Sequence, residues 1–164
     1  MKIYGVTGWK NAGKTTLVER LVADISGRGL RVSTLKHAHH AFDIDQPGKD
    51  SFRHRAAGAE EVLVASGSRF ALMRELRGAA EPTLEELLAR LAPVDLVLIE
   101  GWKRDRHPKI EVWRASSGDA LIAASDETIR AVASNDIPET DRPVLPLDDA
   151  AAVANFILRD LGLG

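Results

Sequence analysis

Residues 8–16 read Gly8-Trp9-Lys10-Asn11-Ala12-Gly13-Lys14-Thr15-Thr16, and this stretch decides the fold. Its spacing, G-x-x-x-x-G-K-[ST], is that of the loop that binds phosphate groups in nucleotide-dependent proteins. Glycine at both ends lets the backbone turn tightly, so that successive N–H groups face one anion. Lys14 would contact the outer phosphates, and the hydroxyl of Thr15 would contact a magnesium ion. A helix that begins at Gly13 would direct the positive end of its dipole at the same point.

The sequence on both sides of this loop supports the interpretation. Residues 2–7 predict a short buried strand at the start of the chain. After the loop, apolar side chains recur along one face of a predicted helix, at Leu17, Val18, Leu21, Val22 and Ile25. Gly27 and Gly29 indicate where this helix ends. Because strand, glycine-rich turn and helix is the context that the motif requires, a glycine loop without a ligand is the weaker interpretation.

The composition is that of an ordinary globular domain, with 45% hydrophobic and 28% charged residues. A chain of 164 residues can bury one core, so we expect a single phosphate-loop nucleotide-binding domain over residues 1–164. The net charge of −2 disfavours nucleic acid as a partner. No apolar run approaches the roughly 20 residues of a membrane span and no signal peptide precedes the loop, so we expect a cytoplasmic protein without a membrane partner. The absence of cysteine excludes disulfides and thiolate chemistry.

Predicted strands and helices alternate along the rest of the chain. Residues 30–36 predict a second strand, which would form a right-handed parallel unit with the first strand and its helix. Residues 61–66 and 69–74 predict a hairpin that turns at Gly67-Ser68. Further strands are predicted over residues 108–113, 120–125, 130–134 and 143–147. Further helices are predicted from Ser51 as N-cap to Gly58, from Pro82 over Leu84, Leu87, Leu88 and Leu91, and from Asp148-Asp149 to the end of the chain.

This order of elements favours a three-layer α/β/α phosphate-loop NTPase fold with a mostly parallel sheet. The hairpin near residue 67 indicates that the sheet is not purely parallel. Residues 94–100 read Val-Asp-Leu-Val-Leu-Ile-Glu, which predicts a strand buried on both faces that ends in the carboxylate of Glu100. In phosphate-loop proteins an acid at this position holds magnesium or its water shell. We therefore predict Thr15 and Glu100 as the magnesium site, against the alternative that Glu100 only ends a strand.

Residues 37–51 have no hydrophobic period and predict a long functional loop at the carboxyl end of a strand. Its histidines are His37, His39 and His40. They could bind a transition metal, contact a phosphate or a pterin, or lie in a solvated loop, which is the favoured interpretation. Its acids, Asp43, Asp45 and Asp50, are candidates for a second carboxylate near magnesium, and the sequence does not rank them.

Two weaker patterns concern charge and base recognition. Lys10 and the basic run Lys103, Arg104, Arg106 and His107 could face an anionic partner, although such a run is usually a solvated face. The Asn-Lys-x-Asp motif by which many GTPases recognise guanine is absent. Ser134-Asn135-Asp136, at the end of a predicted strand, could meet a purine edge, but an ordinary Asn-Asp turn is favoured.

Four segments occur in a characteristic order: residues 8–16, Lys36-His37-Ala38-His39-His40, Asp45-Gln46-Pro47-Gly48-Lys49-Asp50-Ser51 and Glu100-Gly101-Trp102-Lys103. Together they resemble the molybdopterin-guanine dinucleotide biosynthesis protein B (MobB) family, and the resemblance covers nearly the whole chain. The Pro-Gly-Lys-Asp-Ser segment is its specific part, since many families share a phosphate loop. The loop position where related dimeric proteins carry a second lysine is Trp9 here, and the additional lysine is Lys10.

The resemblance implies a GTP-binding accessory protein with weak GTPase activity that works as a homodimer with GTP and Mg²⁺. It would assist the molybdenum cofactor guanylyltransferase, which joins GMP to molybdopterin. Nucleotide would be bound by Gly8, Lys10, Asn11, Ala12, Gly13, Lys14, Thr15, Thr16 and Lys49. Lys14, Glu100 and Asp50 would be the catalytic residues, with Lys49-Asp50 near the γ-phosphate or the partner's pterin.

An ATP-dependent small-molecule kinase or ligase of the phosphate-loop class is the alternative. Such an enzyme often carries arginines on a mobile lid, for which Arg53, Arg55 and Arg74 are candidates, although they fall in a predicted helix and strand. A binding module without nucleotide chemistry is disfavoured because Lys14, Thr15 and Glu100 are all present. No obvious water-positioning base is found, which fits slow turnover and a role as a switch or adapter.

Overall fold

The computed structural model describes residues 1–38 and 42–164, and its chain divides into two compact units. The first, called here the main unit, comprises Met1–His37 and Leu91–Gly164. The second, called the hairpin unit, comprises Ala38–Arg90. Among the described residues, no helix is long and apolar enough to cross a membrane. The two units are described separately below.

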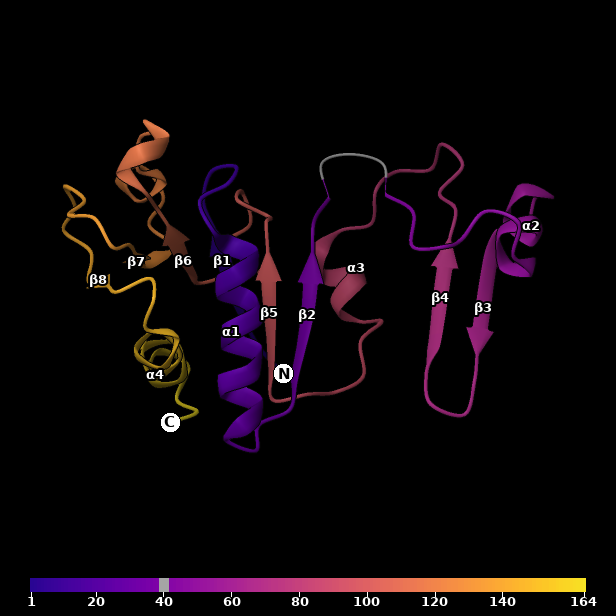
Figure 1. Ribbon diagram of the computed structural model, residues 1–164, viewed down its shortest axis with the longest axis horizontal. Coiled ribbons are helices and arrows are strands. Elements are labelled where there is room, and N and C mark those ends of the chain that lie inside the picture. The colour runs from indigo at the N-terminus through magenta and orange to yellow at the C-terminus, as the bar shows by residue number, and fades with distance from the viewer. Residues whose placement is uncertain (39–41) are drawn as a thin grey trace. The chain divides into compact units, whose positions relative to one another are not determined.

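The main unit is built on a six-stranded sheet with the order β2-β5-β1-β6-β7-β8. Its strands are β1 (Lys2–Thr7), β2 (Val32–Lys36), β5 (Leu96–Glu100), β6 (Lys109–Val112), β7 (Ile129–Ala133) and β8 (Val144–Leu145). Every pairing between these strands is parallel, so all carboxyl ends meet at one edge of the sheet. Figure 1 shows β2 and β5 pointing the same way, towards the loop that joins β1 to α1.

The strand that carries the predicted acid lies between the first two strands. β1 and β2 are parallel as predicted, but both pair with β5, which separates them. The register places Glu100 beside Val6 of β1 and Lys36 of β2. All five residues of β5 are buried, as expected for a strand covered on both faces.

Two helices cover one face of this sheet and pack against each other: α1 (Lys14–Gly27) and α4 (Ala150–Leu161) (Figure 1). Their apolar stripes meet the strands in one core, to which α1 contributes Leu17, Leu21 and Ile25 and α4 contributes Val153 and Ile157. The i, i+4 spacing of these residues in each helix is the pattern that predicts both helices. The predicted α/β class with a mainly parallel sheet is therefore confirmed.

One predicted strand, over residues 120–125, is wrong. This segment contains a 3₁₀ turn, η2 (Ile122–Ala124), and a second 3₁₀ turn, η1 (Ala115–Ser117), precedes it. The reason is a buried carboxylate on β6. Glu111 accepts hydrogen bonds from the backbone N–H groups of Ile122 (2.9 Å) and Ala123 (2.8 Å), which a strand would direct to a neighbouring strand.

The hairpin unit contains α2 (Asp50–Ala56), β3 (Glu61–Ala65), β4 (Phe70–Arg74) and α3 (Leu84–Leu88). The predicted hairpin is confirmed, with Ala65 opposite Phe70 in an antiparallel pair. It forms a separate two-stranded sheet, however, so the inference that it makes the main sheet mixed is wrong. The N-cap predicted at Ser51 is also wrong, because the cap is Lys49 and the Ser51 hydroxyl donates to Asp45 instead.

Candidate phosphate and magnesium site

The loop between β1 and α1 has the backbone that the glycine spacing predicts. Gly8 has a φ of 142°, and a Cβ at this position would lie 2.4 Å from the carbonyl oxygen of Val112. Gly13 has a φ of 107° and immediately precedes α1. A side chain at either glycine would therefore be strained, and at Gly8 it would also clash with β6. The loop thus leads directly into the N-terminus of α1, and a helix N-terminus after a glycine-rich turn is an arrangement that can bind phosphate.

Lys14 is the first residue of α1 and folds back over the loop. Its Nζ donates to the carbonyl oxygen of Trp9 at 2.6 Å. Burial lowers its pKa below the ordinary value, and the nearby ammonium groups of Lys103 and Lys36 act in the same direction against the carboxylate of Glu100. A lysine in this environment gains from an anion that neutralises the cluster, as a polyphosphate would do.

Thr15 and Glu100 meet at the carboxyl end of β5. Thr15 Oγ1 donates to Glu100 Oε1 at 2.8 Å. The ammonium of Lys36 lies 3.4 Å from Glu100 Oε1 and 3.4 Å from Thr15 Oγ1. Mg²⁺ prefers oxygen ligands, so the hydroxyl of Thr15 and the carboxylate of Glu100 fit this ion. The ammonium of Lys36 places a positive charge beside the same two oxygens.

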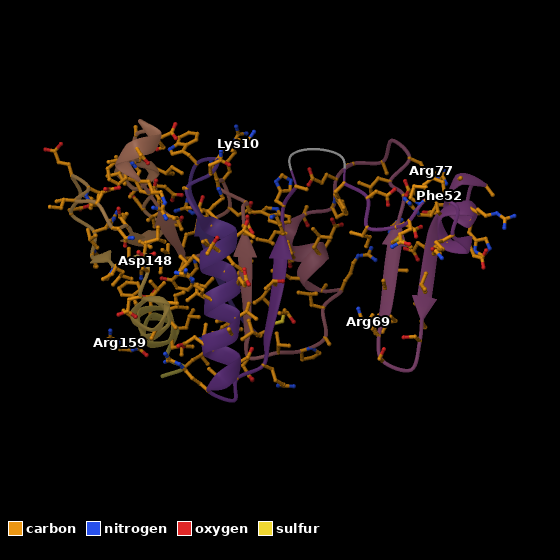
Figure 2. The ribbon with its side chains drawn as sticks, in the orientation of Figure 1. Lys10, Phe52, Arg69, Arg77, Asp148 and Arg159 are labelled. Carbon is orange, nitrogen blue, oxygen red and sulfur yellow. The ribbon has the colours of Figure 1, made fainter. Side chains whose placement is uncertain are left out.

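Two side-chain hydrogen bonds tie the loop to neighbouring segments of the chain. The indole Nε1 of Trp9 donates to the carbonyl of Ala120 at 2.7 Å, and Lys103 Nζ lies 4.0 Å from the centre of the Trp9 ring. On the other flank, Arg114 Nε donates to the carbonyl of Ala12 at 3.0 Å. These contacts preorganise the loop. Of the remaining loop residues, Lys10, Asn11 and Thr16 are exposed and Ala12 is buried, and Figure 2 shows Lys10 at the tip of the loop.

Lys49 and Asp50 belong to the hairpin unit, whereas the loop residues belong to the main unit. Both are exposed, and Asp50 lies 3.7 Å from Arg53. Their predicted role near the γ-phosphate or the pterin stays a prediction.

Arg55 binds the other two acids of this segment, Asp43 and Asp45. It donates to Asp43 (2.9 Å), Asp45 (3.2 Å) and Glu75 (2.7 Å) while its side chain is only 15% exposed. Asp45 also accepts from Ser51 Oγ at 2.7 Å, and this bond above all lowers the pKa of its carboxyl. Asp43 and Asp45 therefore hold the hairpin unit together, as does Arg55, and a guanidinium bound in this way is a poor candidate for a mobile lid.

Of the predicted histidine cluster, His39 and His40 lie outside the described residues. The ring of His37 lies against Trp102, with a centroid distance of 4.7 Å. Within residues 1–38 and 42–164 no group of three or more His, Cys, Asp or Glu side chains could hold a metal ion. Because two of its three histidines lie outside these residues, the histidine metal site stays an alternative interpretation of the sequence.

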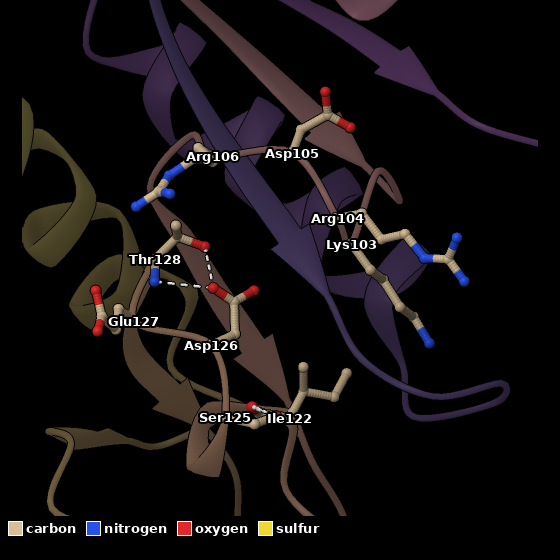
Figure 3. A pocket seen from close by; sticks show the side chains of 9 residues that line it. All are labelled: Lys103, Arg104, Asp105, Arg106, Ile122, Ser125, Asp126, Glu127 and Thr128. Carbon is tan, nitrogen blue, oxygen red and sulfur yellow. Dashed lines mark hydrogen bonds between the residues drawn. The ribbon is translucent and has the colours of Figure 1, made fainter.

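The residues of the basic run after β5 lie in two different environments. Lys103, Arg104 and Arg106 line a cavity of about 570 Å³ whose lining also includes Asp126 and Thr128 (Figure 3). Figure 3 shows Arg106 directed to the opposite side from Arg104. The fourth member, His107, is buried, and burial together with the charge of Lys109 lowers its pKa to about 4. The run therefore does not form one continuous cationic face.

Asn135 and Asp136, the weak candidates for contact with a purine, have different hydrogen-bond partners. Asn135 Nδ2 donates to Asp148 Oδ2 at 2.5 Å, which joins the residues after β7 to those after β8. Asp136 instead accepts from the backbone N–H of Ala115 at 2.8 Å. The amide and the carboxylate that meet are therefore Asn135 and Asp148, rather than Asn135 and Asp136.

Comparison with known proteins gives the same family as the resemblance of the four characteristic segments. The family model of molybdopterin guanine dinucleotide synthesis protein B, MobB, matches residues 3–135. This chain belongs to the MobB family. The molybdopterin-guanine dinucleotide biosynthesis adapter protein of Haemophilus influenzae is 38% identical over 158 residues, which cover 94% of this chain and 86% of the relative. The adapter protein of the same name from Escherichia coli is also 38% identical, with 95% and 91% covered.

Solved MobB structures share the fold. The crystal structure of a MobB homologue from Bacillus stearothermophilus has a TM-score of 0.77 at 30% identity and covers 100% of both chains. Bacillus subtilis MobB has a TM-score of 0.76 at 26% identity and covers 97% of both chains. The resemblance and the α/β fold expected from it are confirmed.

Three side chains near the candidate phosphate loop were not predicted from the sequence as parts of the site: Lys36, Arg114 and Asp148. Each follows or ends a parallel strand, at the edge of the sheet where ligands bind in α/β proteins. This position along the chain is the signal that could have identified them.

Proposed function

We propose that this MobB-family chain binds GTP with Mg²⁺ at residues 8–16 and hydrolyses it slowly. The observation that carries the proposal is the convergence of Lys14, Thr15 and Glu100 at the N-terminus of α1. Lys14 would exchange the Trp9 carbonyl for a phosphate oxygen, and the loop N–H groups would bind the remaining charge. Magnesium would neutralise charge on the outer phosphates.

Slow hydrolysis is consistent with the position of Glu100. Its Oε1 already accepts from Thr15, so this carboxylate is directed at the metal position rather than at an attacking water. Lys14 and the loop amides stabilise charge, but they do not activate a nucleophile. A protein with these parts is better suited to change state with its nucleotide than to turn it over rapidly.

The proposed role is that of an adapter in attaching GMP to molybdopterin. The Haemophilus influenzae and Escherichia coli relatives are both named molybdopterin-guanine dinucleotide biosynthesis adapter proteins and are covered over most of their length. We propose that this chain acts in the same process, with the guanylyltransferase and molybdopterin as its partners.

A homodimer is proposed from the surface of the hairpin unit. Leu63 and Leu72 pair across the two strands, and Phe70 lies two residues from Leu72 on the same face. These side chains are 61%, 45% and 73% exposed. A two-stranded sheet with an uncovered apolar face is marginally stable alone, and a second copy of the chain would cover it.

Thermal unfolding tests the nucleotide proposal. The melting temperature of the full-length chain is measured with Mg²⁺ alone and then with equal concentrations of GTP or ATP. A ligand at 100 times its dissociation constant stabilises the native state by about 2.7 kcal/mol, so GTP should raise the melting temperature by several degrees. A shift with ATP but not with GTP would favour the kinase or ligase alternative, and no shift with either would remove the proposal.

A further inference from the structure

The strand order distinguishes the two sides of the phosphate loop. Glu100 and Lys36 end β5 and β2 on one side of β1, whereas β6, β7 and β8 lie on the other side. Magnesium bound with a nucleoside triphosphate contacts the β- and γ-phosphates. If Thr15 and Glu100 hold this ion, the γ-phosphate lies towards β5. The nucleoside must then leave the loop on the side of β6, β7 and β8.

A small cavity borders the loop on this second side. Its wall is formed by the start of α1 and by the segments after β6 and β8, and it includes Gly13, Thr16, Arg20, Arg114, Leu147 and Asp148. Because Arg114 donates to the Ala12 carbonyl, one wall is tied to the phosphate loop itself. The cavity therefore begins at the glycine that would bind phosphate, where the ribose and base of a nucleotide would lie.

A polar pair stands at the wall of this cavity. Asn135 Nδ2 donates to Asp148 Oδ2, and Arg20 Nη1 lies 3.7 Å from Asp148 Oδ1. The Asp148 side chain is 71% exposed, so its carboxylate can accept further hydrogen bonds. Figure 2 shows Asp148 beside α1. Asp148 thus combines a fixed position with free acceptor capacity.

We propose that Asp148, positioned by Asn135, contacts the base of the bound nucleotide and selects guanine over adenine. The inference rests on the proposed binding of a nucleoside triphosphate. An ionised carboxylate only accepts hydrogen bonds. Guanine presents two adjacent donors, N1–H and its 2-amino group, which one carboxylate accepts together. Adenine presents a lone pair at N1, which would face the carboxylate unpaired, and such mismatches are strongly disfavoured.

Asp136 is the competing carboxylate, since it directly follows Asn135. Its Oδ2 accepts from the N–H of Ala115, which holds the backbone after β6 in place. Among the described residues that line the cavity, the acid is Asp148 and not Asp136. Base selection is therefore assigned to Asp148.

The test is calorimetric titration of the full-length chain with GTP, ATP and xanthosine triphosphate, each with the same excess of Mg²⁺. The wild-type chain should bind GTP about 10-fold or more tightly than ATP, as one bidentate pair can provide. In Asp148→Asn, the carboxamide accepts from N1–H and donates to the C2 carbonyl of xanthine. This variant should lose about 10-fold or more in GTP affinity and gain a similar factor for xanthosine triphosphate. Asp141→Asn, which changes an 85%-exposed acid between β7 and β8, should leave all three affinities unchanged.

An exchange of preference in Asp148→Asn supports the assignment. It is overturned if wild type prefers GTP and Asp148→Asn retains this preference, or if Asp136→Asn exchanges it instead. Equal affinities of wild type for GTP and ATP also overturn it, although the phosphate site then stands. If wild type binds none of the three nucleotides, the proposed function fails as well, and this result is seen before any substitution is made.

Discussion

Thr15 and Glu100 are separated by 85 residues in sequence, yet Thr15 Oγ1 donates a hydrogen bond to Glu100 Oε1 at 2.8 Å. One residue belongs to the first turn of α1 and the other ends the buried strand β5. The parallel register of β1 and β5 creates this contact, because it places Glu100 beside Val6, just before the loop. The site thus depends on the pairing of two strands that are distant in the chain.

Removing the charge of Glu100 should weaken the magnesium dependence of nucleotide binding. In Glu100→Gln, one anionic oxygen at the metal position is lost while the shape of the side chain is kept. We expect the Mg²⁺ concentration for half-maximal GTP binding, measured by calorimetry, to rise about 10-fold or more. The matched control is Asp95→Asn, which changes a carboxylate just before the same strand, where it accepts from Arg31. Equal Mg²⁺ curves for wild type and Glu100→Gln would show that the metal lies elsewhere.

Trp9 should contribute to affinity by fixing the loop before nucleotide binds. Trp9→Phe removes the 2.7 Å hydrogen bond to Ala120 and weakens the contact with Lys103. The loss of one such hydrogen bond costs about 1 kcal/mol, so GTP affinity should fall about 5-fold. Trp113→Phe is the control, because Trp113 donates to Asp119 in the same segment but does not belong to the loop. If both variants bind GTP like wild type, the Trp9 contact does not preorganise the loop.

Local patterns predicted the parts of the site that local patterns can determine. The spacing of residues 8–16 and the apolar run before Glu100 identify a glycine turn and a buried strand wherever they occur in a chain. In contrast, the contact between Trp9 and Ala120 spans 111 residues, and no periodicity reports it. The pairing of Asn135 with Asp148 depends in the same way on β7 and β8 lying side by side.

The errors in the sequence-based fold have a similar origin. Residues 120–125 have the alternation of a strand, but the buried carboxylate of Glu111 binds the N–H groups that a strand would need. The hairpin was predicted correctly as a local element. Which sheet it joins is decided by tertiary packing, which a single sequence does not display.

His107 should make the protein less stable in mild acid. Burial lowers its pKa to about 4, below the ordinary value of 6.5 that it regains on unfolding. As the pH falls below about 6.5, the unfolded state therefore takes up the proton first, and the free energy of unfolding decreases until about pH 4. The decrease attributable to this group should approach about 3 kcal/mol.

The measurement is urea unfolding between pH 7 and pH 4 for wild type and His107→Leu. Neither ring nitrogen of His107 has a hydrogen-bond partner among the described residues, so the apolar side chain should be tolerated at pH 7. His107→Leu should then show a smaller loss of stability in acid than wild type. Parallel pH profiles for the two proteins would contradict the buried neutral histidine.

A charge on the apolar face of the hairpin should separate the proposed dimer. Leu72→Glu places a carboxylate where a second copy would bury Leu63, Phe70 and Leu72. We expect light scattering after size-exclusion chromatography to show a dimer for wild type and a monomer for the variant. Ile137→Glu is the control, because Ile137 is 99% exposed and belongs to the main unit. A dimeric Leu72→Glu protein would place the interface elsewhere, and a monomeric wild type would remove the dimer.

The central claim is that the loop amides and the ammonium of Lys14 capture a nucleoside triphosphate. Calorimetric titration of MgGTP into wild type, Lys14→Ala and Lys2→Ala tests it most directly, since Lys2 is an exposed lysine at the opposite end of β1. We expect wild type and Lys2→Ala to bind equally and Lys14→Ala to bind at least about 100-fold more weakly with an unchanged melting temperature. Equal affinity in Lys14→Ala, or no binding of GTP to wild type, would contradict the account.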